Sequence, residues 1–511
     1  MSDQTSTLSR AQLLYGICLS LAVLIGFLLA DPIQSASVIV LGMVVAVLCW
    51  PIFARWHHPL LVFSFHSAFY AGFLPGNLVL WSLAAAGGFV LLVFHRSINP
   101  NLRLFPPGGV PWALLMLALV VVVTAMAQGG IGFKALGSAS TGSKKYVYIL
   151  LAIMAYFVLV SRPVPPRWAF AYVALFCLSG LTGLLAHGIY AAGSKFYFLF
   201  SFVDPAPAIG QATAEWDVQG KTVFRSTGAT MVASAILGLV IARFGIRELF
   251  DLKRPWRMML VLFCLAGGSL GGFRSFLVGA ILFLGVLFFL EGLHRTKYLA
   301  LVLALSLGGF GLLETFSDRL PDGVQRAISF LPVRVDEHVR QDAQGSTEWR
   351  LRMWEILWAE VPDHLLMGKG FAIDPQALQL SDYNAASGYG IQAEWAVLAG
   401  EYHNGPISVL LPFGIWGALA FLWFIAAAML RFRFLCRQSP PSLARLNRVL
   451  FAMFISKLIL FAVVVGSIYS DLVEFVAVLG IAEALNAGAR PPAEEETPAP
   501  DFITPTEREH A

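Results

Sequence analysis

Residues 110–128 read VPWALLMLALVVVVTAMAQ, a stretch of spanning length without a charged side chain. About 20 apolar residues cross the hydrocarbon core of a bilayer as a helix, and similar runs recur from end to end of this chain. Of its 511 residues, 58% are hydrophobic and only 13% are charged. This pattern predicts an all-α polytopic membrane protein, with about 12–14 transmembrane helices and one large, partly helical loop.

The expected spans leave two long polar intervals, at about 187–226 and 316–404. The apolar segments lie at about 12–30, 36–53, 59–75, 77–95, 110–128, 145–161, 167–186, 227–242, 256–272, 275–291, 297–315, 405–430, 448–466 and 470–486. They divide the chain into N-terminal spans (1–186), a second group of spans (187–315), the large loop (316–404), C-terminal spans (405–486) and a tail (487–511). The tail is rich in Pro and Glu, so we expect it to be disordered.

The distribution of basic residues predicts the orientation of the spans. Lys and Arg gather in alternate short loops, for example at Arg243, Arg295 and Arg448, which places these loops and both termini in the cytoplasm. The large loop then lies on the opposite side. The pair Lys144-Lys145 is the exception, because it falls in a short loop on the outer side.

Bulk properties exclude several functions. A net charge of +4 in a chain of this size gives no reason to expect nucleic acid as a partner. The five cysteines form no C-x-x-C pair, so we expect neither a disulfide framework nor a zinc site, and no cofactor is predicted. The apolar run at 12–30 is followed by further spans and is interpreted as an uncleaved helix rather than a signal peptide.

Three outer arginines have no obvious local counter-ion. Arg225 precedes a span, Arg274 lies at the outer junction of two spans, and Arg350 has no carboxylate three or four residues away. We expect Arg350 to open a loop helix with Ser346 as its N-cap. A guanidinium near a membrane needs an anion, and its planar fork suits phosphate oxygens. The alternative for Arg225 or Arg274 taken singly is an interface anchor that reaches toward the headgroups.

The end of the large loop offers a base. A neutral imidazole at His403 suits an acceptor hydroxyl near neutral pH, and Asn404 could equally be a helix N-cap. Gly368 and Gly370 form a turn through which the backbone can approach a partner closely. The aromatic residues Trp349, Trp354 and Tyr402 could stack on sugar faces or only pack the loop.

Five short motifs follow one another along the chain: Arg225-Ser-Thr-Gly228, Gly-Gly-Phe-Arg274-Ser, Arg350-x3-Trp354, Gly368-x-Gly370, and His403-Asn404 with Gly414 and Gly417. In this order they resemble the O-antigen ligase and O-antigen polymerase family. These are polytopic glycosyltransferases of bacterial envelopes with one large periplasmic loop. The resemblance covers roughly residues 200–430. It implies a multi-pass protein of the bacterial inner membrane, acting in surface polysaccharide assembly such as O-antigen or exopolysaccharide.

The resemblance also implies a reaction. The donor would be a glycan on undecaprenyl diphosphate, and the acceptor a sugar hydroxyl on lipid A core or on another lipid-linked glycan. Arg274 and Arg350, supported by Arg225, would hold the diphosphate, and His403 would take the acceptor proton with Asn404 orienting it or the sugar. One direct displacement would invert the anomeric carbon, without a metal ion because arginines carry the phosphate charge.

Two other functional classes stay open. A transporter of lipid-linked oligosaccharides, a flippase, would favour repeated halves and polar groups near the midplane, whereas the polar residues here gather on one outer side. A non-catalytic membrane component of an export complex would tolerate loss of Arg350 and His403. Within the enzyme reading, the sequence leaves ligase and polymerase as equal alternatives.

Overall fold

The computed structural model describes residues 35–72, 74, 76–99, 105–129, 143–208, 223, 225–372, 397–398 and 400–489, with isolated positions between 15 and 26. The chain divides into two compact units, Met1–His57 and His58–Ala511. The described part of the first unit is mainly α2 (Ser35–Ser64), which continues into the second. The predicted span at 12–30 lies largely outside the described residues, and so does the predicted disordered tail from residue 490 onward. All that follows concerns the second unit.

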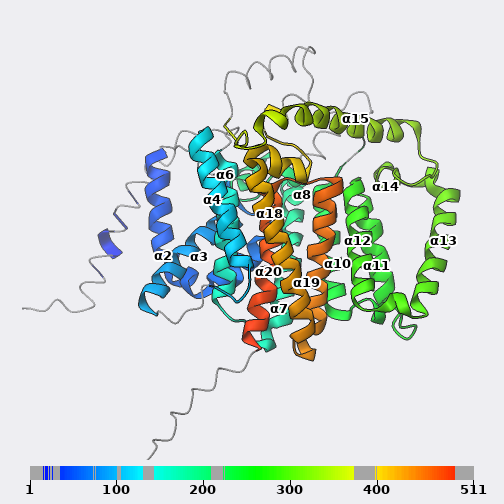
Figure 1. Cartoon of the computed structure of the whole chain (residues 1–511), viewed down its shortest axis with the longest axis horizontal. Helices are drawn as coiled ribbons and strands as arrows, with labels where there is room; N and C mark the ends of the chain where they lie inside the picture. The colour runs from blue at the N-terminus through cyan, green and yellow to red at the C-terminus, as the bar shows by residue number, and fades with distance from the viewer. Residues whose placement is uncertain are drawn as a thin grey trace, which may run out of the picture. The chain divides into compact units, whose positions relative to one another are not determined.

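Helices dominate the second unit (Figure 1). Among the described residues, eight helices are long and apolar enough to cross a membrane, and two further apolar helices are shorter. This confirms an all-α polytopic membrane protein. The helices of the bundle are α3 (Leu80–Ile98), α4 (Val110–Gln128), α6 (Ser143–Ser161), α7 (Ala169–Leu178), α8 (Gly183–Ala192), α10 (Thr227–Phe244), α11 (Trp256–Ser269), α12 (Arg274–Leu290), α18 (Gly405–Gln438), α19 (Pro441–Ile459) and α20 (Ile468–Gly488). The apolar helix α13 (Tyr298–Phe316) has no buried residue.

The separate span predicted at 59–75 is wrong. The helix α2 ends at Ser64, and the chain then forms a two-stranded antiparallel hairpin of β1 (Tyr70–Ala71) and β2 (Leu78–Val79). Between the strands, Gly76 and Asn77 have φ values of 86° and 48°. Glycine and asparagine accept positive φ more easily than other residues, so the chain can turn here despite its apolar composition.

The polar residues within the C-terminal helices are paired. In α20, Asp471 and Glu474 both contact Lys457 of α19, at 2.9 and 2.7 Å. Glu483 of α20 forms a two-pronged ion pair with Arg431 of α18. Charges within a membrane bundle are expensive unless they meet a partner, so these pairs explain how α20 can carry three carboxylates.

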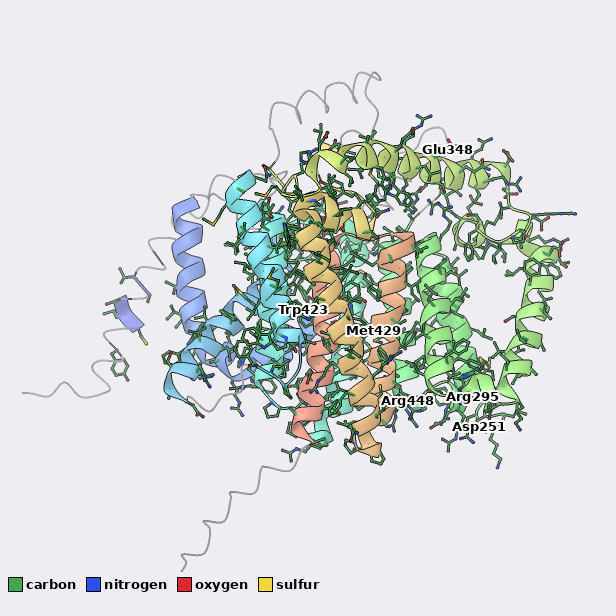
Figure 2. All side chains as sticks on the ribbon, viewed as in Figure 1. Asp251, Arg295, Glu348, Trp423, Met429 and Arg448 are labelled. Atoms are coloured by element: carbon green, nitrogen blue, oxygen red, sulfur yellow. The ribbon has the colours of Figure 1, made fainter. Side chains whose placement is uncertain are left out.

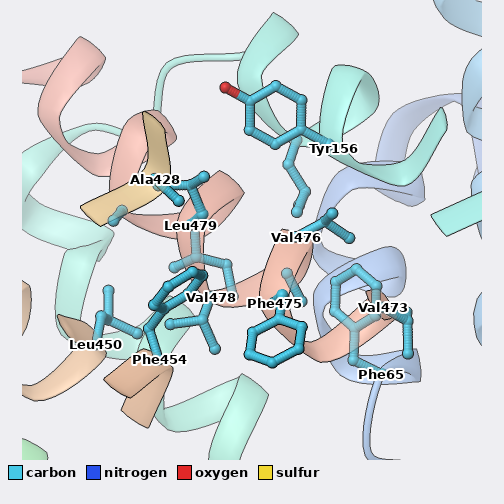
Figure 3. Packing of buried hydrophobic residues seen from close by; sticks show 14 of the residues in the cluster. Phe65, Tyr156, Ala428, Leu450, Phe454, Val473, Phe475, Val476, Val478 and Leu479 are labelled. Atoms are coloured by element: carbon cyan, nitrogen blue, oxygen red, sulfur yellow. The ribbon is translucent and has the colours of Figure 1, made fainter. Parts of the chain in front are cut away.

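Apolar side chains from α18, α19 and α20 interlock in the centre of the unit (Figure 3). Phe454 of α19 and Phe475 of α20 are each 1% exposed, and their rings meet edge-on at 5.3 Å. Close packing of this kind matters because lipid tails are as apolar as the side chains, so helices associate through complementary contact rather than by hydrophobic burial alone. The result is a rigid frame for residues at the helix ends.

The large loop forms helices of its own at one end of this frame. Its helices are α14 (Asp322–Ile328) and α15 (Glu337–Glu360), and α15 lies across the ends of the bundle helices (Figure 1). Glu348 marks α15 in Figure 2, whereas Arg295 and Arg448 lie at the opposite end of the helices. The loop and these basic residues are therefore separated by the length of the spans, as their predicted placement on opposite sides of a membrane requires.

Candidate functional site

The helix α15 is the platform of the candidate site. It begins at Glu337, with Asp336 in the N-cap position, so the predicted start at Ser346 is wrong. Because side chains three or four residues apart share a helix face, the earlier start aligns Ala343, Thr347 and Arg350 along one stripe. This stripe meets the start of α12, where Arg274 contacts Ala343 and Thr347.

A turn between α11 and α12 brings the other arginines to this platform. Gly271 accepts a hydrogen bond at its carbonyl from the backbone N–H of Ser226, at 3.1 Å, which fixes the segment that carries Arg225. The carbonyl of Gly272 accepts from the guanidinium of Arg326 in α14. Gly272 has a φ of 72°, a left-handed conformation that favours glycine. The glycines of this motif thus serve backbone packing.

A single carboxylate, Asp342, joins two of the arginines. Its oxygens accept from Nη2 of Arg225 at 2.9 and 3.1 Å and from Nε of Arg326. Arg326 is buried, with 4% of its side chain exposed, whereas 38% of the Arg225 side chain stays exposed. Arg225 has no local counter-ion, as expected, but the fold supplies a distant one, because Asp342 lies 117 residues away in the sequence.

Arg274 and Arg350 have no ion pair in the described part of the chain. Arg274 donates to Thr347 Oγ1 and to the carbonyl of Ala343, each at 3.2 Å. The Nε atom of Arg350 is buried without a hydrogen-bond partner among the described residues. Burial lowers the pKa of Arg350, and the charges of Arg326 and Arg225 lower it further.

The four guanidiniums Arg225, Arg274, Arg326 and Arg350 are named here the arginine cluster. Four positive charges and the one carboxylate of Asp342 leave an excess of three within the described residues. Like charges about 6 Å apart repel by about 3 kcal/mol at an effective dielectric constant of about 20. An anion with several oxygens would relieve this repulsion and would supply the acceptor that the Arg350 Nε lacks.

His403 lies beside the arginine cluster. Its ring meets the ring of Trp349 edge-on at 5.5 Å. Burial lowers the pKa of His403 from its usual value of 6.5, Arg350 and Lys145 lower it further, and Glu401 opposes them. The imidazole is therefore neutral at pH 7 and able to accept a proton.

Asn404 caps the helix that follows. Its side-chain oxygen accepts from the backbone N–H of Ile407 at 3.0 Å, so the N-cap interpretation is confirmed. The cap fixes the residue directly after His403 and commits the Asn404 oxygen to the backbone.

The loop aromatics have different environments. Trp354 donates through Nε1 to the carbonyl of Tyr402 at 3.2 Å and is half-buried. Tyr402 is only 3% exposed and packs with Met353 and Leu357, which favours loop packing of the two alternatives for this residue. Trp349 keeps its ring next to His403.

Gly368 and Gly370 approach a backbone closely, as predicted, and that backbone belongs to α18. Both have φ near 70°, and the N–H groups of Lys369 and Gly370 donate to the carbonyls of Leu411 and Pro412 at 2.8 and 3.0 Å. A Cβ at Gly368 would lie 2.2 Å from the Pro412 oxygen. These carbonyls are accessible because α18 is interrupted at Gly414, whose φ is 62°. The glycines therefore anchor the large loop to the bundle.

Several residues of the site were not recognised from the sequence. Asp342 and Arg326 were missed because their partners are distant along the chain. Lys145 was also missed as a residue of the site, although the sequence contains a signal for it. It is a basic residue on the side of the spans that the charge pattern predicts to be poor in Lys and Arg. The structure places Lys145 next to the segment that carries His403, where it contacts Glu401 at 3.0 Å.

This geometry combines a polyanion site with a neutral base, which suits the departure of a phosphorylated group and the deprotonation of an incoming hydroxyl. Residues 257–422 match the family model described as O-antigen ligase. The match includes Arg274, Arg326, Asp342, Arg350 and His403. No curated protein gives a significant sequence match to the chain.

Proposed function

We propose that the chain transfers a glycan from undecaprenyl diphosphate to a sugar hydroxyl. The match of residues 257–422 to the family model described as O-antigen ligase supports this proposal. The family supports a role in polysaccharide assembly by a multi-pass membrane protein. The specific donor, acceptor and chemistry are proposed from the site.

The arginine cluster binds the diphosphate of the donor. Arg274 and Arg350 are the two members without a carboxylate partner in the described structure, so their donors are the ones available to phosphate oxygens. Arg225 is half-exposed and can turn one edge to the ligand while it holds Asp342. Buried Arg326 keeps Asp342 in place and adds positive charge to the cluster. Trp354 and Gly368 and Gly370 act indirectly, by fixing the large loop.

The reaction is a single displacement at the anomeric carbon. The acceptor oxygen forms a bond to this carbon as the bond to the phosphate oxygen breaks, and undecaprenyl diphosphate leaves with the bonding electrons. The acceptor proton passes to the neutral ring of His403. The guanidiniums offset the negative charge that develops on the leaving diphosphate, as a metal ion would elsewhere. Attack from the opposite face inverts the anomeric configuration.

The location follows from the donor. Undecaprenyl-diphosphate glycans meet this site if the large loop lies in the periplasm, at the outer leaflet of the inner membrane. Lipid A core as acceptor makes the enzyme a ligase, and a second lipid-linked glycan makes it a polymerase.

The observation that carries this proposal is the excess positive charge of the arginine cluster beside a neutral His403. Reconstitution tests it. The purified protein is placed in liposomes with lipid-linked repeat units and a chelator, with and without lipid A core. Longer lipid-linked glycans formed without core indicate a polymerase, and product that requires core indicates a ligase. Intact donor binding without any new glycosidic bond would overturn the enzyme proposal in favour of a transporter.

A further inference from the structure

Lys145 stands in an unusual place for a lysine. It lies on the side of the spans that the charge pattern predicts to be poor in basic residues, and it is buried, with 8% of its surface exposed. Its neighbour Lys144 has different contacts, with Nζ 3.4 Å from the carbonyl of Asn77 and 5.2 Å from the centre of the Tyr148 ring. A buried lysine needs a reason, and its partners supply one.

Lys145 holds the segment before His403 at two points. Its Nζ donates to the carbonyl of Gly400 at 2.8 Å and forms an ion pair with Glu401 at 3.0 Å. Glu401 in turn accepts from the hydroxyl of Tyr469 in α20 at 2.7 and 2.8 Å. The start of α6 and the start of α20 thus clamp residues 400 and 401 from two sides.

The fit around Lys145 is tight. A Cβ at Gly400 would lie 3.1 Å from the lysine Nζ, and Gly400 has a φ of 70°. The Nζ also lies 4.6 Å from the centre of the Tyr469 ring, within range of a cation–π contact. The lysine therefore has ionic, hydrogen-bonding and aromatic partners in the clamp.

His403 itself is strained. Its φ is 46°, and it is one of only two residues other than glycine with positive φ in the described structure. This conformation costs roughly 1–2 kcal/mol for a residue with a Cβ and persists only where the surroundings enforce it. Here Lys145 fixes the residues before, Trp354 fixes the carbonyl of Tyr402, and the Asn404 cap fixes the residue after.

We infer that Lys145 is a positioning residue, which acts through Glu401 and Gly400 to hold the strained His403 with its ring toward Trp349 and the arginine cluster. The inference rests on the proposed function, in which His403 is the base. Lys145 touches no reacting atom in this account. Without the clamp, the backbone at His403 relaxes toward an unstrained conformation and the ring leaves its place.

The charges around His403 make the pKa of its imidazole a measurable test. A purely structural role of Lys145 would leave this pKa unchanged. The groups that face it are Glu401, Arg350 and Lys145, with the ring of Trp349. Removing the Lys145 charge raises the pKa of His403, because a nearby positive charge disfavours the imidazolium. Removing the Glu401 charge lowers this pKa. The two variants should shift the acid limb of the pH–rate profile in opposite directions.

The test compares Lys145→Met with Lys144→Met in the reconstituted full-length protein, with undecaprenyl-diphosphate-linked repeat units as the substrate. We expect Lys145→Met to lower kcat about a hundredfold, the effect of a misplaced catalytic group, while donor KM stays within about twofold. Lys144→Met should keep wild-type activity. Lys145→Arg should recover part of kcat, because its guanidinium can still reach Glu401.

The outcomes separate this inference from the proposed function. If His403→Ala is inactive while Lys145→Met matches wild type in kcat and pH profile, positioning by Lys145 is refuted and the function stands. If wild type forms no glycosidic bond, the proposed function fails first. If Lys145→Met unfolds, Glu401→Gln and Tyr469→Phe replace it. Wild-type kcat and an unmoved acid limb in both of these variants would refute the clamp.

Discussion

The chain handles positive charge differently in two regions. In the bundle, Arg431 pairs with Glu483, and Lys457 has two carboxylates, Asp471 and Glu474. At the end of the bundle, the arginine cluster holds four arginines and one carboxylate, Asp342, which pairs with Arg225 and Arg326 only. Matched charges hold helices together, whereas an unmatched excess is stable only if something else neutralises it. The contrast supports the proposal that the arginine cluster binds an anionic ligand, whereas the bundle pairs have their partners within the protein.

The largest effect should follow from removing the two arginines that lack a carboxylate partner in the described structure. Each of Arg274→Ala and Arg350→Ala should reduce transfer about 10²–10³-fold, because each removes charge-assisted hydrogen bonds to the leaving group, and the double variant should be inactive. Glycan transfer is measured with reconstituted protein. The matched control is Arg352→Ala on the exposed side of α15, which should behave as wild type. Full activity in the double variant would contradict the proposal that the arginine cluster, unlike the bundle pairs, binds a ligand.

The bundle pair should affect folding instead of chemistry. Arg431→Leu leaves Glu483 buried without its partner, which should lower the free energy of unfolding by about 3–5 kcal/mol. Adding Glu483→Leu should restore most of this stability. Thermal unfolding in detergent measures both, and transfer per folded molecule should remain at the wild-type level. A loss of transfer in a fully folded double variant would show that bundle charges also take part in the reaction.

The pH dependence should reflect a lowered pKa at His403. Because burial and the nearby cations keep the folded-state pKa below 6.5, the neutral base is present at pH 7 and is lost only as pH falls through that lower value. The acid limb of kcat/KM should therefore have its midpoint below pH 6.5, and His403→Ala should remove it. A midpoint above pH 7 would mean that acidic neighbours dominate His403 and that the arginine cluster does not reach it.

The smallest effect should come from the one carboxylate of the cluster. Asp342→Asn raises the excess charge from three to four, so the affinity for a diphosphate should increase about fivefold, equivalent to about 1 kcal/mol. Direct binding measurements with a short-chain prenyl diphosphate would show this. A weaker affinity would mean that holding Arg225 in place matters more than the charge that Asp342 cancels.

Hydropathy predicted most of the spans because bilayer thickness dictates helix length. The interval 110–128 coincides with α4, and α12 begins at Arg274, one residue before its predicted start. The hairpin at β1 and β2 escaped this reasoning, since an apolar segment before a tight turn resembles a short span until its backbone conformation is known.

The candidate site was only half visible in the sequence. Arg274 and His403 are recognisable as isolated polar residues next to spans, and Arg350 as a loop arginine without a carboxylate three or four residues away. The Asn404 cap follows from local chemistry. The start of α15 was misplaced because Gly345 and Ser346 interrupt the helical pattern. Glycine in a helix costs about 1 kcal/mol, which the packing of buried Val339 and Ala343 outweighs. With the start predicted at Ser346, Asp342 fell outside the predicted helix and was not considered as a partner. Its contact with Arg225 forms only in the fold.

The most direct test of the arginine cluster is binding of the diphosphate itself. Purified protein in detergent is titrated with undecaprenyl diphosphate and with undecaprenyl monophosphate, by calorimetry or thermal shift, as wild type, the Arg274→Ala, Arg350→Ala double variant and Arg352→Ala. We predict that wild type and Arg352→Ala bind the diphosphate more tightly than the monophosphate and that the double variant loses this preference. Equal affinity of the double variant and wild type for the diphosphate would contradict the assignment of the cluster as the donor site.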